Sequence, residues 1–331
     1  MDENFENWEE AAPLPDAEEL KKIRQSLTKR NWKIVLTSLV LAAALLLAGV
    51  SVIVPAVESL YWGPYDGEFD AGSDLKLVIQ SYTELFQPGR TVNILAGDSG
   101  FASYELILTR TDTATGEKEY LNGTLTQGDL SLDYPYFDRS MEQHYLYLDD
   151  EPEEVQEIWA EDTAEVLSEL PEYVQLKAVA FFPEDLTMEQ VMELNFHYNY
   201  DVRNKVSLLW IAVQNGGKMP CGFSATPSYG YEMNEHYPDF GMYDVEADGS
   251  HMERHFKSLL QFSYDQVKKD KGLPVKIAEG DYYQYVLDYV EENGVMTYGC
   301  LVTGTPQGLQ AMLDSGTASH IVLLDGWIDV G

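Results

Sequence analysis

Residues Ile34–Val57, IVLTSLVLAAALLLAGVSVIVPAV, decide the architecture of this chain, and no charged residue lies between Lys33 and Glu58. At a rise of about 1.5 Å per residue, these 24 residues form a helix about 36 Å long. That length crosses a hydrocarbon core of about 30 Å with some tilt. No polar face interrupts the run, as it would in a helix of a soluble core. The stretch therefore predicts a transmembrane helix.

Basic residues gather on one side of this predicted helix. Residues 1–33 contain 6 Lys and Arg, and the first basic residue after the helix is Lys76. Because an excess of Lys and Arg keeps its side in the cytoplasm, we expect a cytoplasmic N-terminus and an extracytoplasmic C-terminus. The alternative is a cleaved signal peptide, but that needs an apolar region of about 7–15 residues behind a short basic start. The prediction is a single-pass protein of the cell membrane.

Acidic residues dominate the part after the helix. The chain has 21 Lys plus Arg and 56 Asp plus Glu; residues 1–33 hold 6 basic and 8 acidic residues, so residues 58–331 keep 15 and 48, a net charge of −33. Such a surface repels phosphate groups, which argues against direct nucleic-acid binding and against contact with anionic lipid. The length of this part suggests about two domains.

The N-terminal arm, residues 1–33, contains a helix-capping pattern and apolar residues that we expect to be exposed unless a membrane or a partner buries them. Asp16 and Glu19 have the spacing of a capping box, and the helix they begin is expected to run into the membrane span. A basic juxtamembrane helix lying on anionic headgroups is one interpretation. The other is a partner-binding arm, because exposed apolar side chains favour docking. The candidate partner-binding residues are Phe5, Trp8, Leu20, Ile23 and Leu27.

Short alternating runs predict a β-rich module after the membrane. The expected strands are Leu75–Ile79, Thr91–Leu95, Tyr104–Thr109, Glu119–Leu125 and His144–Leu148, with a hairpin turn at Thr113–Gly116. Pro152 then opens an amphipathic helix that must end before Pro171.

From Tyr173 onward the pattern changes between strands and helices. Expected strands are Val174–Phe182, Val206–Val213, Cys221–Ala225, Val295–Thr303 and His320–Asp325; expected helices are Asp185–Leu194 with Asp185 as its cap, His251–Lys269, Asp281–Glu292 and Pro306–Leu313. This order predicts an α+β sheet with helices on one face.

The fold class we expect is therefore α+β, with a single-pass membrane anchor, a β-rich exterior module and then an α+β exterior module. The predicted divisions are 1–33 (cytoplasmic arm), 34–57 (transmembrane helix), 58–150 (β-rich module), 151–172 (connecting helix) and 173–331 (C-terminal module).

No catalytic or metal-binding constellation emerges from the sequence. His251 and His255 lie at i, i+4 in HMERH, but Glu253 fits neither metalloprotease order, and an exposed, partly titrating helix face is the plainer interpretation. Cys221 and Cys300 show neither a metal nor a redox spacing; a disulfide and two buried free thiols both stay open. We expect no enzyme, no cofactor and no metal.

Three stretches resemble a known family. They are KKIRQSLTKRNWKIVLTSLVLAAALLL at the anchor, YTELFQPGRTVNILAGDSGFASYEL from Tyr82 to Leu106, and a C-terminal set made of LPEYVQLKAVAFFPEDLTMEQVMEL, VSLLWIAV and YGCLVTGTPQGLQAML. They look like membrane-anchored anti-sigma factors with sigma factor regulator N-terminal and C-terminal domains. The chain departs from the family in its acidic start, MDENFENWEEAAPLPD, and in the lack of a zinc-type anti-sigma motif before the anchor.

The resemblance implies a cytoplasmic segment that holds an extracytoplasmic-function sigma factor and an ectodomain that senses or transmits an envelope signal. We therefore expect an anti-sigma factor whose partners are that sigma factor and the membrane, reached through residues 34–57. The alternative is a membrane-anchored protein that binds an extracellular ligand and whose N-terminal tail serves only to set the topology. A cell-surface hydrolase with an unassembled active site is a third interpretation.

Overall fold

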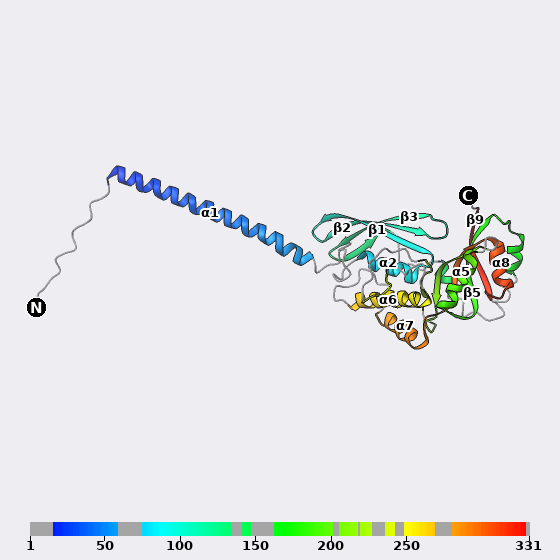
Figure 1. Ribbon diagram of the computed structural model, residues 1–331. Helices are drawn as coiled ribbons and strands as arrows, with labels where there is room; N and C mark the ends of the chain where they lie inside the picture. The colour runs from blue at the N-terminus through cyan, green and yellow to red at the C-terminus, as the bar shows by residue number, and fades with distance from the viewer. Residues whose placement is uncertain are drawn as a thin grey trace, which may run out of the picture. The chain divides into compact units, whose positions relative to one another are not determined.

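The computed structural model describes residues 16–58, 75–133, 141–146, 162–200, 205–217, 219–226, 236–241, 248–268 and 280–328. The chain divides into two compact units, Met1–Ser59 and Leu60–Gly331. Mixed helices and strands follow one apolar N-terminal helix (Figure 1). The α+β fold class and the β-rich region after the helix are thereby confirmed.

The described part of the N-terminal unit is a single helix, α1 (Ala17–Glu58). The Asp16 carboxylate accepts a hydrogen bond from the Glu19 N–H at 2.7 Å, so Asp16 caps the helix as predicted. Thr37 donates its hydroxyl to the Lys33 carbonyl, which satisfies a polar group without breaking the helix. In the described chain, α1 alone is long and apolar enough to cross a membrane, and its apolar stretch is unburied.

The first sheet of the C-terminal unit has the order β1-β2-β3-β4, with every pair antiparallel. Its strands are β1 (Arg90–Gly100), β2 (Ser103–Asp112), β3 (Lys118–Thr126) and β4 (Asp129–Leu132). The predicted turn at Thr113–Gly116 is confirmed: the Gly116 N–H donates to the Asp112 carbonyl, and Gly116 has φ +74°.

Helix α2 (Leu75–Phe86) replaces the strand expected at Leu75–Ile79. It packs against β1, the C-terminal strand β7 (Cys221–Ser224) and helix α6 (Gly249–Lys268). Every residue of α2 except Lys76 is buried. The five residues Leu75–Ile79 are mostly apolar and too few to show a helical period, whereas α2 as a whole keeps one. The prediction of a strand was wrong for that reason.

The second sheet has the order β7-β6-β8-β5-β9, also antiparallel throughout. The strands are β5 (Val174–Thr187), β6 (Val206–Val213), β8 (Met296–Gly304) and β9 (His320–Ile328) in addition to β7. The helices are α5 (Met188–Tyr200), α6, α7 (Gly280–Asn293) and α8 (Pro306–Asp314). α5 and α8 contact the sheet, and α6 packs on α5, α2 and α7.

Two further expectations need correction. Asp185 lies within β5, and α5 starts later: the Thr187 hydroxyl accepts from the Gln190 N–H while the Gln190 side chain accepts from the Thr187 N–H, a capping box. His144 lies in helix α3 (Met141–Tyr145), where a strand was expected. Leu146, just after α3, packs with Phe181 and Trp210 on the sheet face opposite α5 and α8, so helices do not lie on one face alone.

One hydrophobic core joins the two sheets. It includes Leu106, Leu108 and Leu121 of the first sheet together with Ala178 and Val302 of the second. Cys221 and Cys300 are buried free thiols, which decides between the two alternatives for these cysteines. Helical residues 162–169 end before Pro171, as expected, whereas Pro152 lies outside the described residues. The boundaries at residues 150 and 172 remain predictions.

Candidate functional site

The part of α1 before the apolar stretch presents apolar side chains to its surroundings. Leu20 is 54% exposed and Leu27 is 50% exposed. Residues seven positions apart lie about two helical turns apart on the same side of a helix. Phe5 and Trp8 lie outside the described residues, as does the side chain of Ile23. All five candidate partner-binding residues therefore remain predictions, and the described ones share a helix face.

Glu84 and His255 form a buried ion pair in the C-terminal unit. The distance between His255 Nε2 and Glu84 Oε1 is 2.9 Å, and both side chains are at most 1% exposed. The other ring nitrogen of His255 lies 2.8 Å from the Asp239 carbonyl oxygen. The Ser224 N–H also donates to Glu84 Oε1, and the Trp210 indole N–H donates to the Glu84 carbonyl. The pair thus joins α2 to α6 and to strands β6 and β7.

His255 therefore does not lie on an exposed helix face, as the sequence had suggested. Burial lowers its pKa, but the charge and hydrogen bond of Glu84 raise it more, so the pKa lies above its ordinary value of 6.5. His251 instead lies 3.0 Å from the carboxylate of Asp248 at the helix start. The two histidines have different partners. In the described part of the chain, no group of three or more His, Cys, Asp and Glu could hold a metal ion.

This pair predicts a dependence of stability on pH. A histidine whose pKa is raised on folding stabilises the fold fully below its unfolded pKa, and this contribution is lost as the pH rises through the folded pKa. We expect the free energy of unfolding of residues 60–331 to fall above about pH 6.5, by at most about 1.4 kcal/mol per pH unit for one proton. Denaturant unfolding between pH 6 and 9 measures this slope. The His255→Gln variant should flatten it, whereas His251→Gln should keep it; equal slopes in all three proteins would contradict the assignment.

A second buried network joins the two sheets through Lys177 of β5. Lys177 Nζ lies 2.9 Å from Asp112 Oδ2 and 2.5 Å from Glu142 Oε1. Arg90 also reaches both carboxylates, at 2.9 Å from Asp112 and 3.5 Å from Glu142. Burial raises the pKa of each carboxyl, but Lys177 and Arg90 lower it more, so both pKa values lie below their ordinary range. Two cations and two anions compensate each other, as buried charges require.

Sequence reasoning missed both ion networks. Glu84 and His255 are 171 positions apart, and nothing in either local sequence marks a partner at that distance. The sequence could have predicted that Lys177 pairs with a carboxylate, because a lysine in the apolar strand VQLKAVAFF needs an anionic partner if the strand is buried. The identity of its partners follows only from the fold.

Comparison with known protein families gives a match to the C-terminal sheet and its helices. A family model described as sigma factor regulator C-terminal matches residues 148–319. This region includes β5 to β8 and α5 to α8, and so most of the five-stranded sheet and its helices. α1 and the four-stranded sheet lie outside the match, so the likeness to the N-terminal domain of that family stays a prediction. No curated protein and no solved structure matches the chain.

Proposed function

We propose, from the premise that the chain belongs to the sigma factor regulator family, that it is an anti-sigma factor of the extracytoplasmic-function class. Residues 1–33 would sequester the sigma factor and so deny it to RNA polymerase. The family is a regulatory one, and a sigma factor is the partner that it implies. Within the described residues, one apolar helix suited to anchoring the protein in the membrane accompanies the family domain.

The observation that supports this proposal most directly is the continuity of α1. One helix runs from the cap at Asp16 through the apolar stretch to Glu58, so residues 17–33 of the arm extend the anchor. Leu20 and Leu27 are exposed on this extension. Exposed leucines on a helix favour docking into an apolar groove of a partner, and the neighbouring lysines and arginines favour an acidic rim around that groove.

The proposed orientation places the arm in the cytoplasm. The basic residues before the apolar stretch favour that side, and the net charge of −33 on residues 58–331 would keep the C-terminal part away from anionic lipid. In this orientation only the arm can meet a cytoplasmic sigma factor. The C-terminal unit would sense or transmit a signal from the envelope.

The direct test separates the arm from the remainder. Residues 1–60 expressed alone should capture the sigma factor and silence it, and deletion of residues 1–31 should abolish capture. Affinity purification from membranes, with sigma-dependent transcription as the readout, measures both. Capture that survives the deletion would favour the alternative, a ligand-binding ectodomain with a topogenic tail.

A topology prediction tests the orientation independently. In intact protoplasts, external protease should remove the part after Glu58 and leave an N-terminal tag intact. The physical reason is the charge asymmetry across the apolar stretch, so changing the six basic residues before it to acidic ones should scramble insertion. Immunoblotting of tags at both ends measures the result. A protected C-terminus would reverse the orientation.

A further inference from the structure

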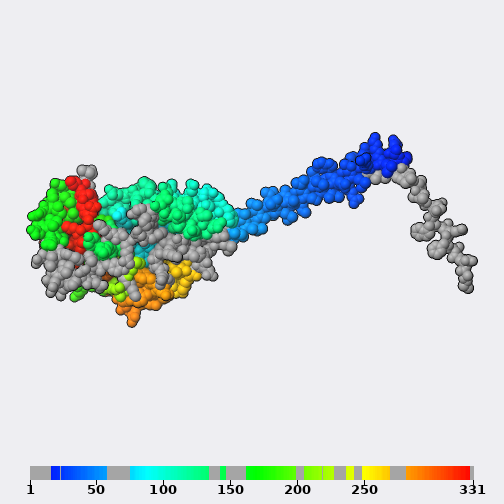
Figure 2. Space-filling model, turned by 180° about the vertical axis from the view of Figure 1, so that it is seen from behind, coloured from blue at the N-terminus to red at the C-terminus, as the bar shows by residue number. Residues whose placement is uncertain are grey.

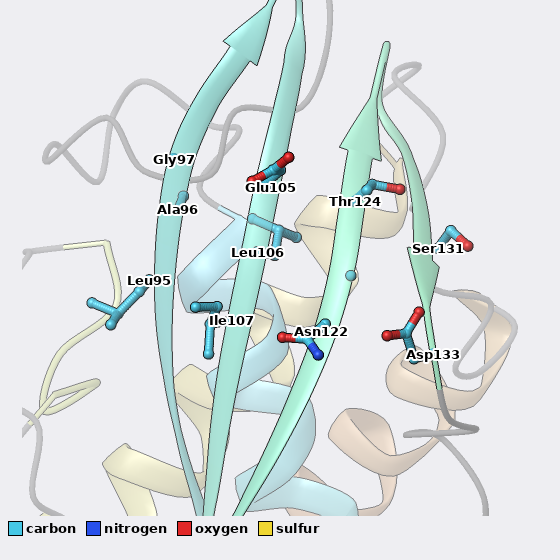
Figure 3. Close-up of a pocket in the computed structure, with 11 residues that line it drawn as sticks. Leu95, Ala96, Gly97, Glu105, Leu106, Ile107, Asn122, Thr124, Ser131 and Asp133 are labelled. Carbon is cyan, nitrogen blue, oxygen red and sulfur yellow. The ribbon is translucent and has the colours of Figure 1, made fainter.

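The face of the four-stranded sheet that points away from α2 carries a hollow of about 560 Å³ (Figure 3). Two rows of side chains cross the strands and form its walls, as the strand registers show. One row is Leu95, Ile107, Asn122 and Asp133; the other is Gly97, Glu105, Thr124 and Ser131. Figure 2 shows side chains of this sheet, coloured teal, at the molecular surface.

The hollow opens toward β1 because Gly97 leaves a gap in the second row. A Cβ atom added to Gly97 would meet nothing within 4 Å. Gly97 pairs directly with Glu105 on β2, so a long side chain approaching over Gly97 reaches the Glu105 carboxylate. Leu95, the preceding residue of β1 on this face, is 60% exposed. The entrance therefore offers an apolar contact next to an acidic one.

The outer edge of β1 has backbone groups that point away from the sheet. In the described part of the chain β1 pairs with β2 alone. The Thr113 N–H donates to the Gly89 carbonyl at the start of this pairing, so odd-numbered residues of β1 bond to β2. Because the antiparallel pattern alternates, even-numbered residues direct their N–H and C=O groups outward.

Side chains cover the first half of this edge but not the second. The Gln80 amide donates to the Val92 carbonyl at 3.3 Å, and the Ile94 N–H donates to the Asn93 side chain at 3.0 Å. Within the described residues, no comparable contact covers Ala96. An edge strand with uncovered backbone groups is a template for another strand, and proteins that do not use such an edge usually block it.

We propose that the edge of β1 from Leu95 to Asp98 binds a cationic peptide as an added strand. The peptide's main chain would bond with Ala96, and its side chains on the outer face would alternate. An apolar one would lie beside Leu95, and a Lys or Arg two residues away would cross Gly97 to Glu105. Peptide recognition at this edge stands apart from the sigma-factor arm.

Charge selects this occupant over the other candidates. The residues that line the hollow include Glu105 and Asp133 and no lysine or arginine. A second copy of the chain would bring another net charge of −33 from its residues 58–331, which opposes pairing of two such edges. The chain's own segment 59–74 has four acidic residues and no basic one. A cationic peptide, in contrast, is attracted by the whole unit.

Peptide binding to the full chain in zwitterionic nanodiscs tests the proposal. The probe is a short fluorescent peptide in which valine and lysine alternate with threonine, and its control has glutamate in place of lysine. Fluorescence anisotropy should show saturable binding of the lysine peptide, weakened by added salt, and at least about tenfold weaker binding of the glutamate peptide. Empty nanodiscs report binding to lipid. No saturable binding, or equal binding of the two peptides, overturns the proposal.

Three variants locate the site. Ala96→Pro removes an outward N–H that the sheet does not use and should weaken binding about tenfold or more. Gly97→Val fills the gap and should weaken it similarly. Glu105→Gln should cost about threefold, whereas Glu119→Gln, on the same sheet outside the hollow, should change nothing. Unchanged melting temperatures verify folding, and if Ala96→Pro misfolds, Gly97→Val and Glu105→Gln decide. Wild-type affinity in a folded Ala96→Pro or Gly97→Val protein overturns strand addition at this edge.

Discussion

Changing Leu20 and Leu27 together to aspartate should release the sigma factor from the membrane-bound protein. Each leucine is about half exposed on α1, and in the proposed complex both would be buried in the partner's apolar groove. An aspartate there is a charge without a partner in a desolvated site, at a cost of about 2–5 kcal/mol each. Ile23, predicted to lie on the same face, should respond in the same way. Affinity capture and sigma-dependent transcription measure the release.

The helix offers a control matched in charge. At about 100° per residue, Gln25 lies nearly opposite the face of Leu20 and Leu27. Gln25→Asp adds the same negative charge to an exposed position and should leave capture nearly unchanged. Lys29→Ala, on the basic side, should weaken capture slightly and mainly at low salt. Equal capture by wild type and by the double leucine variant would exclude this face as the binding surface.

Changing Lys177 to methionine should destabilise residues 60–331 by about 3–5 kcal/mol. The side chain is almost wholly buried, pairs with both Asp112 and Glu142, and is the closer of the two cations to Glu142. Methionine has a similar volume but no charge, so the variant leaves two buried carboxylates with only the partly exposed Arg90 to compensate them. Denaturant unfolding at neutral pH measures the loss in free energy.

Two further variants distinguish the loss of charge from the loss of packing at Lys177. Lys177→Met combined with Asp112→Asn and Glu142→Gln removes the uncompensated charges and should recover part of the lost stability. Lys118→Met, at an exposed position of β3, should change stability by less than about 0.5 kcal/mol. A Lys177→Met protein as stable as wild type would mean that the network contributes nothing to the joint between the sheets.

The network of Lys177, Asp112 and Glu142 also predicts how the stability of the fold changes at low pH. A carboxyl whose pKa is lowered on folding stabilises the fold above its unfolded pKa, and the contribution is lost as the pH falls through the folded pKa. For Asp112 and Glu142 the loss therefore begins below their ordinary values of 3.8 and 4.5. The stabilisation from the His255–Glu84 pair is instead lost as the pH rises above about 6.5. Both networks contribute their stabilisation in the interval between these limits.

Much of the architecture follows from local patterns. The uncharged stretch of residues 34–57 predicts the apolar part of α1 because a run of that length without a polar face has one stable environment. Strands β1 to β3, β6 and β8 show alternating or β-branched residues that a half-buried or buried strand requires. Gly294 and Pro306 mark the end of α7 and the start of α8, because each residue restricts the backbone locally.

The errors fall where tertiary contacts override the local pattern. Leu75–Ile79 is apolar enough for a strand, and it forms a helix because β1, β7 and α6 together cover every side of α2. Asp185 has the chemistry of a helix cap, but β5 continues past it to Thr187, paired with β8. Neither the helix at Leu75–Ile79 nor the strand at Asp185 can be predicted from a short stretch of sequence, because the contacts that decide between helix and strand come from distant parts of the chain.

The sequence alone determined the membrane anchor, the basic arm before it, the acidic part after it and most of the C-terminal helices and strands, since each depends on composition or on spacing along the chain. Only the tertiary structure decided which charges meet. Glu84 with His255, and Lys177 with Asp112 and Glu142, come together through strand register and helix packing. Burial made those pairs obligatory, because a charge removed from water needs an opposite charge within hydrogen-bonding distance.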